Sequence, residues 1–405
     1  MISLRPFRAW RPVADKAHLV GSRTYVSYSP EELERRLADN PHSFLHVLRP
    51  DDAHTEKLTR SERFHRVRMA FKRFCDNGTM VRDDAPAILV YEQSANGNTS
   101  RGIIAGVNVQ DYREGRIKVH EQTLTARENL FAEYLGSTGI NAEPVLLTTP
   151  EGTAWEALLD PLLTTRPVYD FRTNDRVRHR LWAITDERTR EQLQRAFAQI
   201  PALYIADGHH RLASSARLAE GNRCTDVDPA AWCLAFIVPR SQLFIYNFDR
   251  AITDLGGRTE TELLTALASV GTLESVPAPW SAPGTIGVRT QSGWHVLHLP
   301  PPAAERAPAD KLDAARLSEL VLGPVLGIHD LRTDQRARFV PGTAGTAELD
   351  RMVDSGEAAI AFHLHPVNFA ELKAVADNGG TMPPKSTYIE PKLRSGLVVY
   401  SLEEA

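Results

Sequence analysis

The feature that most restricts the fold is an abrupt change of polarity near residue 207. The apolar run at 202–206 is typical of a short strand, and the stretch at 212–219 is typical of a helix. Between them lies the block Asp207-Gly208-His209-His210-Arg211. The order predicts a strand-to-helix junction, where the first backbone N–H groups of a helix can bind an anion.

The rest of the chain alternates between strand-like and helical stretches. Hairpins and crossovers both occur, which predicts an α+β fold with a mixed sheet. A capping box is expected at Thr125 and Glu128, and a hairpin with a somewhat enlarged turn at Asn96-Gly97. Helices are expected at about 29–38, 55–75, 125–135, 186–200, 309–322, 346–353 and 367–376. Strands are expected at about 87–91, 102–107, 177–184, 232–238, 243–248, 358–364 and 396–402.

The 405 residues are enough for one large or two ordinary domains. A stretch rich in proline, serine and glycine at about 277–285 is the best candidate for a boundary. We therefore expect a first lobe, residues 1–275, that carries the Asp207 block. A second α+β lobe, residues 276–405, would carry the loop Lys385-Ser386-Thr387-Tyr388.

Composition excludes several classes of function. The net charge is −4 and no run of five like charges occurs, so nucleic acid is not an expected partner. No apolar stretch approaches the roughly 20 residues that span a bilayer, and no apolar segment of a signal peptide follows Met1–Pro6. Cys75, Cys224 and Cys233 are scattered, which indicates a reducing, cytoplasmic location and no zinc site.

The Asp207 block has the chemistry of a phosphate site. Gly208 lacks a β-carbon, and the start of a helix adds about half a positive charge. Arg211 can hold phosphate oxygens in a fork, and His209 and His210 can donate further hydrogen bonds. Asp207 would hold Mg²⁺ or orient a histidine.

A simpler interpretation is that Asp207 caps the helix and the histidines lie on the surface. Burying so many polar groups without a ligand would be costly, which favours the phosphate site. A metal hydrolase is less well supported, because adjacent histidines do not share a helix face.

Two other clusters could complete a site. In His120-Glu121-Gln122-Thr123, Glu121 could take a proton from an attacking hydroxyl or bind a metal; otherwise it is a solvated turn residue. Before the last strand, Pro383 and Pro384 stiffen a loop in which Lys385 could hold a phosphate or carboxylate; otherwise the loop is an ordinary connection.

Three further polar residues have simpler explanations. We expect His363 and His365, on one face of a strand, to be packed in the core or exposed rather than to bind a metal. Glu92 is expected on the surface at the end of a strand.

The Asp207–Arg211 block is similar to a motif of the ParB/sulfiredoxin superfamily, notably its free-serine kinases. Sulfiredoxins carry a cysteine where this chain has His209, so their redox chemistry is not expected here. Over essentially its full length the chain resembles the family called domain of unknown function 1015. The segments that carry this resemblance occur in order at 5–9, 119–124, 178–182, 204–211, 354–358 and 382–388.

The chain departs from that family at two segments. Val20–Ser27 lacks a pair of prolines and an acid that relatives have, and Gly136–Ile140 replaces an Asn-Phe-Ser-Pro-like turn. If the first segment borders the site, Arg23 could meet an anionic group of the substrate. The alternative is a distant surface loop that has drifted.

The resemblance implies a ParB/sulfiredoxin-like core and a nucleotide-dependent phosphotransferase that uses ATP, or another nucleoside phosphate, with Mg²⁺ near Asp207. The acceptor would be a small hydroxylated metabolite, with free serine as the first choice by analogy. Residues expected to bind the nucleotide are Gly208, His209, Arg211, Lys385, Ser386 and Thr387. Those expected at the acceptor are Glu121 as base, with His120, Thr123, Tyr388 and Arg23. A nucleotide-binding switch of the ParB type without DNA binding, and a phosphate-ester hydrolase, stay open as alternatives, and a homodimer is possible.

Overall fold

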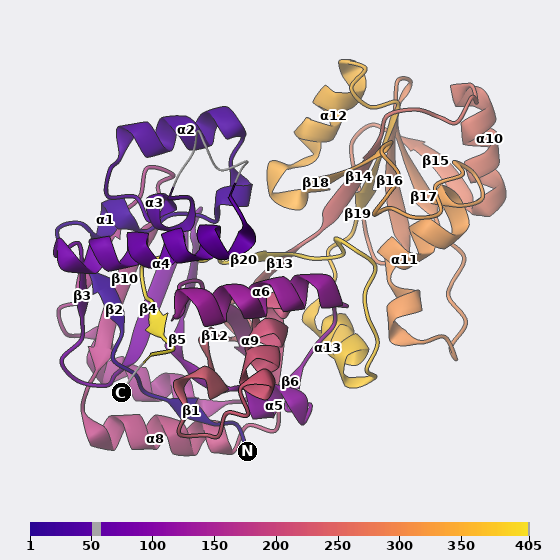
Figure 1. The fold of residues 1–405 in the computed structure, drawn as a ribbon. Coiled ribbons are helices and arrows are strands. Elements are labelled where there is room, and N and C mark those ends of the chain that lie inside the picture. The colour runs from indigo at the N-terminus through magenta and orange to yellow at the C-terminus, as the bar shows by residue number, and fades with distance from the viewer. Residues whose placement is uncertain (51–57, 404–405) are drawn as a thin grey trace. The chain divides into compact units, whose positions relative to one another are not determined.

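The computed structural model describes residues 1–50 and 58–403, so the expected helix start near Thr55 lies outside the described residues. Internal contacts divide the chain into two compact units (Figure 1). The first unit consists of Met1–Lys118, Thr123–Leu243 and Pro391–Ala405. The second consists of Val119–Gln122 and Phe244–Glu390.

A nine-stranded sheet forms the centre of the first unit. The pairs β6–β11 and β8–β12 are parallel and the other pairs are antiparallel, which confirms the expected α+β fold with a mixed sheet. In spatial order the strands are β6 (Ile117–Lys118), β11 (Leu203–Asp207), β8 (Val145–Thr149), β12 (Trp232–Pro239), β5 (Asn98–Asn108), β4 (Ile88–Ala95), β10 (Arg178–Ile184) and β9 (Tyr169–Arg172), with β1 (Leu4–Arg5) paired to β5.

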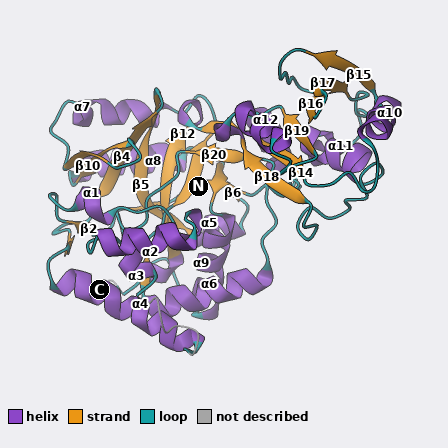
Figure 2. Cartoon of the chain, turned by 90° about the horizontal axis from the view of Figure 1, so that it is seen from above, coloured by secondary structure: helices purple, strands orange, loops and turns teal. Residues whose placement is uncertain are grey.

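Helices α4, α6 and α9 gather on one side of these strands (Figure 2). Leu212, Ala213 and Ala216 of α9 are buried, and their small average size lets the helix pack closely on α6 and the sheet. The helices of this unit are α1 (Ala17–Val20), α2 (Pro30–Asp39), α3 (Leu45–Leu48), α4 (Arg60–Asp76), α5 (Val109–Arg113), α6 (Thr125–Thr138), α7 (Asp160–Leu163), α8 (Glu187–Ala198) and α9 (His209–Gly221). Two small strand pairs, β2 (Trp10–Pro12) with β3 (Met80–Arg82) and β7 (Ile140–Asn141) with β21 (Tyr400–Ser401), complete it.

The helix caps and the hairpin turn predicted from local sequence agree only in part with the structure. Ser29 caps α2 as its sequence predicts, and its hydroxyl accepts a hydrogen bond from the Glu32 N–H at 3.2 Å. The capping box expected at Thr125 is wrong: α6 has no side-chain cap, and Thr123 instead donates its hydroxyl to Glu128. The hairpin turn is tighter than expected, because Asn96 and Gly97 alone connect the paired residues at the ends of β4 and β5.

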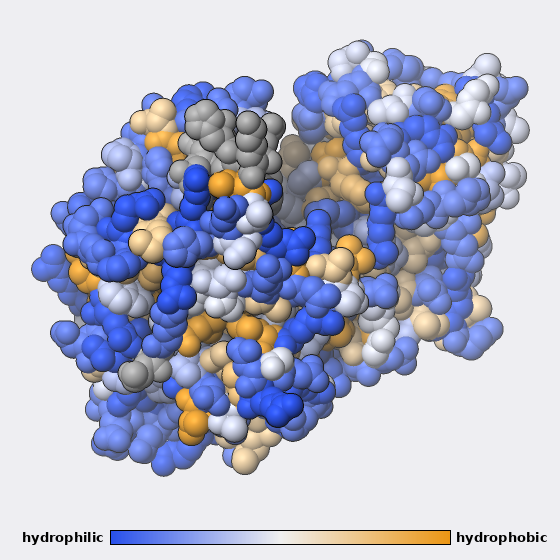
Figure 3. Space-filling view, in the orientation of Figure 1, coloured by the Kyte–Doolittle hydropathy of each residue, from blue (hydrophilic) through white to orange (hydrophobic). Residues whose placement is uncertain are grey.

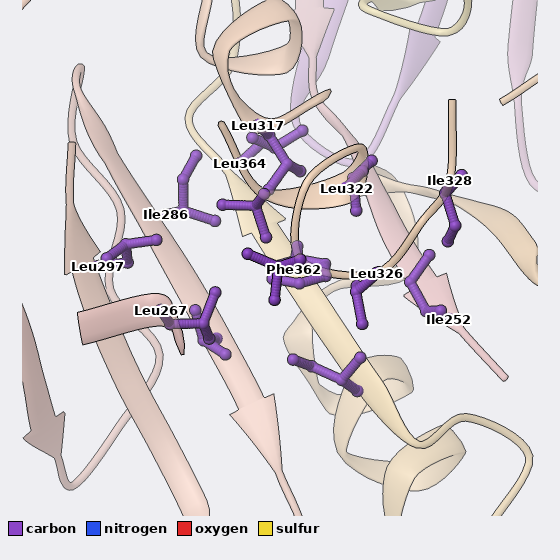
Figure 4. Close-up of a cluster of buried hydrophobic side chains, with 14 of the residues drawn as sticks. Ile252, Leu267, Ile286, Leu297, Leu317, Leu322, Leu326, Ile328, Phe362 and Leu364 are labelled. Carbon is purple, nitrogen blue, oxygen red and sulfur yellow. The ribbon is translucent and has the colours of Figure 1, made fainter. Parts of the chain in front are cut away.

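The second unit has a six-stranded antiparallel sheet. Its order is β15 (Thr272–Val276), β17 (Gly293–His298), β16 (Thr285–Thr290), β19 (Ile360–Leu364), β14 (Phe248–Ile252) and β18 (Ala337–Pro341). Phe362 lies at the centre of the hydrophobic cluster on one face, among Ile252, Ile286 and Leu322 (Figure 4). The other face packs on α12 (Thr346–Asp354).

Around this sheet the second unit also contains α10 (Glu260–Val270), α13 (Phe369–Asp377) and a small pair of strands, β13 (Phe244–Tyr246) with β20 (Tyr388–Glu390). The helix expected at 309–322 is divided into a 3-10 turn at Pro308–Lys311, α11 (Asp313–Leu317) and a π-turn at Ser318–Leu322.

The compact units divide at Leu243, ahead of the expected boundary between residues 275 and 276. The physical reason is strand pairing. Strands β14 and β15 both belong to the sheet of the second unit, so the stretch at 277–285 is a connection from β15 to β16 inside that sheet. The last residues return to the first unit, where Tyr400 of β21 pairs with Asn141 of β7.

Most of the surface visible in Figure 3 is hydrophilic, in keeping with the 24% of charged residues. None of the helices within residues 1–50 and 58–403 is long and apolar enough to cross a membrane.

Candidate functional site

The Asp207 block lies at the junction expected from its sequence, with Asp207 ending β11 and His209 beginning α9. Gly208, between them, has a φ of 98°, a left-handed conformation that favours glycine. A β-carbon on Gly208 would also lie 2.7 Å from two guanidinium nitrogens of Arg211. Glycine is therefore needed here for its conformation and for the close approach of Arg211.

Arg211 is held between two carboxylates of the first unit. Its guanidinium donates to Asp207 Oδ2 at 2.8 Å and to Glu143 Oε1. Burial disfavours its charge, but Glu143 and Asp207 more than offset this and raise the pKa of Arg211. The Lys392 ammonium lies 3.8 Å from the other Asp207 oxygen, and the Asp207 side chain is 46% exposed. The junction therefore holds two anionic and two cationic groups at the protein surface.

The two histidines of the block differ. His209 is buried, with 4% of its surface exposed. His210 is half-buried, and its Nδ1 is buried without a hydrogen-bond partner. Burial, followed by the charge of Arg127, lowers the pKa of His210, and Glu128 partly opposes this. This environment favours the neutral form of His210, whose buried Nδ1 is left without a hydrogen-bond partner.

Glu143 is a site residue that the sequence did not reveal. It lies 68 positions from Arg211 in the chain, just before β8. Strand β8 runs antiparallel to β11, and Leu146 pairs with Asp207. The start of β8 therefore lies beside the end of β11, so knowledge of this pairing would have identified Glu143.

The divergent N-terminal segment is tied to the same unit. Arg23 forms an ion pair with Asp175 at 3.0 Å, and the buried Arg394 donates to Asp175 at 2.6 and 2.8 Å. Ser22 and Ser395 exchange two backbone hydrogen bonds, and the Ser395 hydroxyl donates to Glu143 at 3.4 Å. The segment is thus linked to the Arg211 cluster, and the anionic group that Arg23 meets is Asp175.

Asp175 is strongly acidic in this environment. Burial raises its pKa, but hydrogen bonds from Thr173 and Arg394 and the charges of Arg394 and Arg23 more than compensate and lower it to about 2.

The other expected site residues, apart from Thr123, belong to the second unit. His120 is buried, and its carbonyl accepts from the N–H of Met382 at 2.8 Å. Glu121 is exposed. The structure thus brings the His120–Glu121 pair to the segment that leads into the Lys385 loop. Convergence of Glu121 and Lys385 with Asp207 stays a prediction.

Arg250 holds the Lys385 loop through hydrogen bonds to its backbone. This arginine is 1% exposed and donates to the carbonyls of Pro384 at 3.3 Å and Lys385 at 3.0 Å. Burial lowers the pKa of Arg250 to about 10. The loop position is therefore fixed by an arginine that sequence reasoning did not identify.

The side chains of the Lys385 loop differ in burial. Lys385 is exposed, has a φ of 55° and places its ammonium 5.1 Å from the Phe248 ring. The Ser386 hydroxyl is buried and donates to Pro383 O at 2.8 Å. Thr387 is half-buried, and the Tyr388 ring contacts that of Phe248 edge-on at 5.5 Å. Lys385 is therefore the most exposed of the four loop residues, and Ser386 is the most buried.

No group of three or more His, Cys, Asp or Glu side chains that could hold a metal occurs in the part of the chain that the structure describes. Asp207, the residue of the block expected to bind Mg²⁺, is partly exposed beside the start of α9. A single carboxylate suits Mg²⁺ that takes its other ligands from water and a nucleotide phosphate.

The family described as "Protein of unknown function (DUF1015)" matches residues 4–315. No curated protein matches.

Several solved structures are distantly similar. One is free serine kinase in complex with AMP, 13% identical, with 73% of this chain and 92% of that chain covered and a TM-score of 0.38. Another is a mutant of free serine kinase with ADP, 12% identical, with the same coverage and a TM-score of 0.38. A conserved hypothetical protein from Pyrococcus furiosus is 12% identical, with 74% of this chain and 96% of that chain covered and a TM-score of 0.37.

Proposed function

Since the chain belongs to the family of unknown function DUF1015, we propose its function from the β11–α9 junction: a nucleotide-dependent phosphotransferase that acts on a small hydroxylated metabolite. The observation that carries this proposal is the left-handed Gly208, over which Arg211 lies at the start of α9. That arrangement directs a helix N-terminus and a guanidinium toward the same place, as a phosphate site requires.

Two polar atoms at the junction support a ligand there. Nδ1 of His210 and Nε of Arg211 are both buried and have no hydrogen-bond partner. Buried polar atoms are rarely left unpaired, so each such atom needs an explanation, and a bound ligand or water would supply it.

The charges at the junction indicate which ligand fits. Arg211 is already neutralised by Asp207 and Glu143, so a bare triphosphate would meet an additional carboxylate as well as a cation. Mg²⁺ at the exposed Asp207 would remove that conflict, because the ion neutralises phosphate charge and accepts carboxylate ligands. We therefore propose that the nucleotide binds as its magnesium complex, with ATP as the first choice.

The remaining roles rest on the resemblance of the motifs. Glu121 is the proposed base, Lys385, Ser386 and Thr387 are proposed nucleotide contacts, and free serine is the first acceptor by analogy. His120, Thr123, Tyr388 and Arg23 are proposed around the acceptor, although the Thr123 hydroxyl is occupied by Glu128. A ParB/sulfiredoxin-like core and a cytoplasmic location belong to the same proposal.

The test is a calorimetric screen of ATP, CTP, ADP and AMP with and without Mg²⁺, followed by phosphorus NMR with hydroxyl acceptors that include serine. Binding that requires Mg²⁺, with transfer of the terminal phosphate to one acceptor, is the expected result. Binding without transfer would instead support the nucleotide switch, and release of inorganic phosphate from a phosphorylated metabolite would support the hydrolase. No binding of any nucleotide would refute all nucleotide-dependent functions.

Glu121→Gln separates catalysis from binding. It is expected to leave nucleotide affinity nearly unchanged and to depress turnover by roughly two to four orders of magnitude, the range for loss of a general base. Loss of binding with normal turnover per bound nucleotide would make Glu121 a ligand of the metal–nucleotide complex instead.

A further inference from the structure

Three side chains of the second unit form a hydrogen-bonded chain that plays no part in the proposed phosphotransfer. Asp249 of β14 accepts from His363 of β19, whose Nδ1 lies 3.1 Å from both carboxylate oxygens. The other ring nitrogen of His363, Nε2, lies 3.3 Å from the hydroxyl oxygen of Ser281. Serine, histidine and aspartate thus follow one another in the order of a nucleophile, its base and the group that orients the base.

The two strands fix the first half of this chain. Arg250 of β14 is paired with Phe362 of β19, which places the next residues, Asp249 and His363, on the opposite face of the same pair of strands. Asp249 is 1% exposed and also accepts from the backbone N–H of Leu364 at 2.9 Å. The carboxylate is therefore buried and held by a second hydrogen bond, as expected of a group that orients a histidine.

Gly287 makes room for the second hydrogen bond of the chain, the one between His363 and Ser281. It pairs with His363 across β16 and β19, on the side of His363 away from β14. A β-carbon at this position would lie 3.1 Å from the β-carbon of His363 and 3.2 Å from the carbonyl oxygen of Trp280. The absence of a side chain thus lets the loop after β15 cross the sheet here and carry Ser281 to the imidazole.

The hydrogen bonds also assign the proton on His363. A carboxylate can only accept, so the proton lies on Nδ1, facing Asp249. In the neutral imidazole Nε2 then carries no proton, and it can accept the hydroxyl proton of Ser281. This is the tautomer that a general base needs.

The surroundings of Ser281 indicate the substrate class. Ser281 and His363 are partly exposed. Trp280, the residue before Ser281, has 49% of its surface exposed. Its ring lies against that of His298 at 6.1 Å. An exposed tryptophan beside a serine hydroxyl offers an apolar surface to the carbon chain of a substrate.

We propose that Ser281, His363 and Asp249 form a second active site, one that hydrolyses esters or thioesters with an apolar acyl chain. The Ser281 oxygen forms a bond to the acyl carbon while its proton passes to His363 Nε2. The alcohol or thiol then leaves, taking that proton from His363, and Ser281 carries the acyl group. Water attacks the acyl carbon, gives one proton to His363 and releases the carboxylic acid, and the proton returns to the Ser281 oxygen.

The test uses an alkyl fluorophosphonate on the full-length chain, without nucleotide, with the modified residue located by mass spectrometry. The expected result is one adduct, on Ser281, with fluoride as the leaving group. Hydrolysis of p-nitrophenyl butyrate is measured in parallel.

Ser281→Ala should abolish both labelling and ester hydrolysis, and His363→Gln should slow both by roughly a thousandfold or more. The matched control is Ser292→Ala, since this serine of the same unit donates its hydroxyl to Glu260 and not to a histidine. Asp249→Asn should slow labelling while Ser281 stays in place, and circular dichroism checks that each variant is folded.

Absence of an adduct on the folded wild-type chain would overturn the proposal. So would labelling or hydrolysis that persists in Ser281→Ala, or a His363→Gln rate equal to that of the wild type. Because no nucleotide is present, these outcomes are independent of the phosphotransferase.

Discussion

Arg211 in the first unit and Arg250 in the second are both held by several acceptors, but the acceptors differ. Arg211 lies between the carboxylates of Asp207 and Glu143, and its pKa is raised. Arg250 meets backbone carbonyls and the face of Phe339, and burial lowers its pKa to about 10. A cation paired with carboxylates at a partly exposed site can exchange them for a ligand, whereas a cation sealed among carbonyls fixes a loop.

The strongest test of this contrast is Arg250→Met. Removing the buried guanidinium leaves the carbonyls of Phe248, Pro384 and Lys385 with fewer donors, so the second unit should lose about 3 kcal/mol of unfolding free energy. Denaturant unfolding followed by circular dichroism measures the loss. Arg338→Ala, on the neighbouring strand β18, is the control and should cost under about 1 kcal/mol, because its ion pair with Glu357 is exposed. Equal losses would end the distinction between the two kinds of arginine.

The second test is Arg211→Ala. If Arg211 serves a ligand, nucleotide affinity or transfer should fall by roughly one to three orders of magnitude, the scale for removal of one electrostatic stabiliser. Titration calorimetry and phosphorus NMR measure the change. Arg195→Ala, on α8 of the same unit, is the control, since its ion pair with Glu191 is exposed and should not affect the nucleotide. A loss of stability without a loss of nucleotide affinity would show that Arg211, like Arg250, only stabilises the fold.

Arg394 sharpens the comparison, because it is buried like Arg250 but paired with a carboxylate like Arg211. The folded pKa of Asp175, about 2, lies below its unfolded value of about 3.9, so folding favours the ionised form. This stabilisation, about 2 kcal/mol, is present above pH 4 and is lost as pH falls from about 4 to 2. Unfolding measured across that range should show a shallower slope for Asp175→Asn. An unchanged slope would show that the pair is not coupled to folding.

A smaller effect is expected from Gly208→Ala. The left-handed conformation should cost about 1 to 2 kcal/mol, and the new methyl group must also displace Arg211. Gly78→Ala is the matched control, because Gly78 has a φ of 72° with open space around it. The difference in thermal stability between Gly208→Ala and Gly78→Ala measures the cost of the contact between the new methyl group and Arg211. If the two variants are equal, Arg211 moves without cost and is not positioned by Gly208.

The smallest effect is expected from Arg23→Ala. Its ion pair with Asp175 is partly exposed, so stability should change by under about 1 kcal/mol. Measuring KM for each acceptor at saturating nucleotide tests whether Arg23 also meets the substrate. A raised KM for acidic acceptors alone is the expected result, and an unchanged KM for every acceptor would make Asp175 its sole partner.

Sequence reasoning succeeded where the determinant is local. The change from apolar run to polar block gave the β11–α9 junction, and Ser29 and Asn96-Gly97 gave a cap and a hairpin. It failed where the partner is distant. Glu92, expected on the surface, is buried between Arg101 and Arg180, because its strand β4 lies between β5 and β10. Glu143, Arg250 and the Asp249–His363 pair likewise depend on contacts across many residues, which no local pattern encodes.

The return of Pro391–Ala405 to the first unit has a consequence for biosynthesis. The second unit from Phe244 to Glu390 is continuous apart from Val119–Gln122, so most of its chain emerges from the ribosome before the residues that finish the first unit. Lys392 and Ser395, which contact Asp207 and Glu143, are translated after the second unit. The site at Gly208 is therefore completed only after the second unit has been translated. This long-range closure makes folding of the first unit slow relative to formation of its helices.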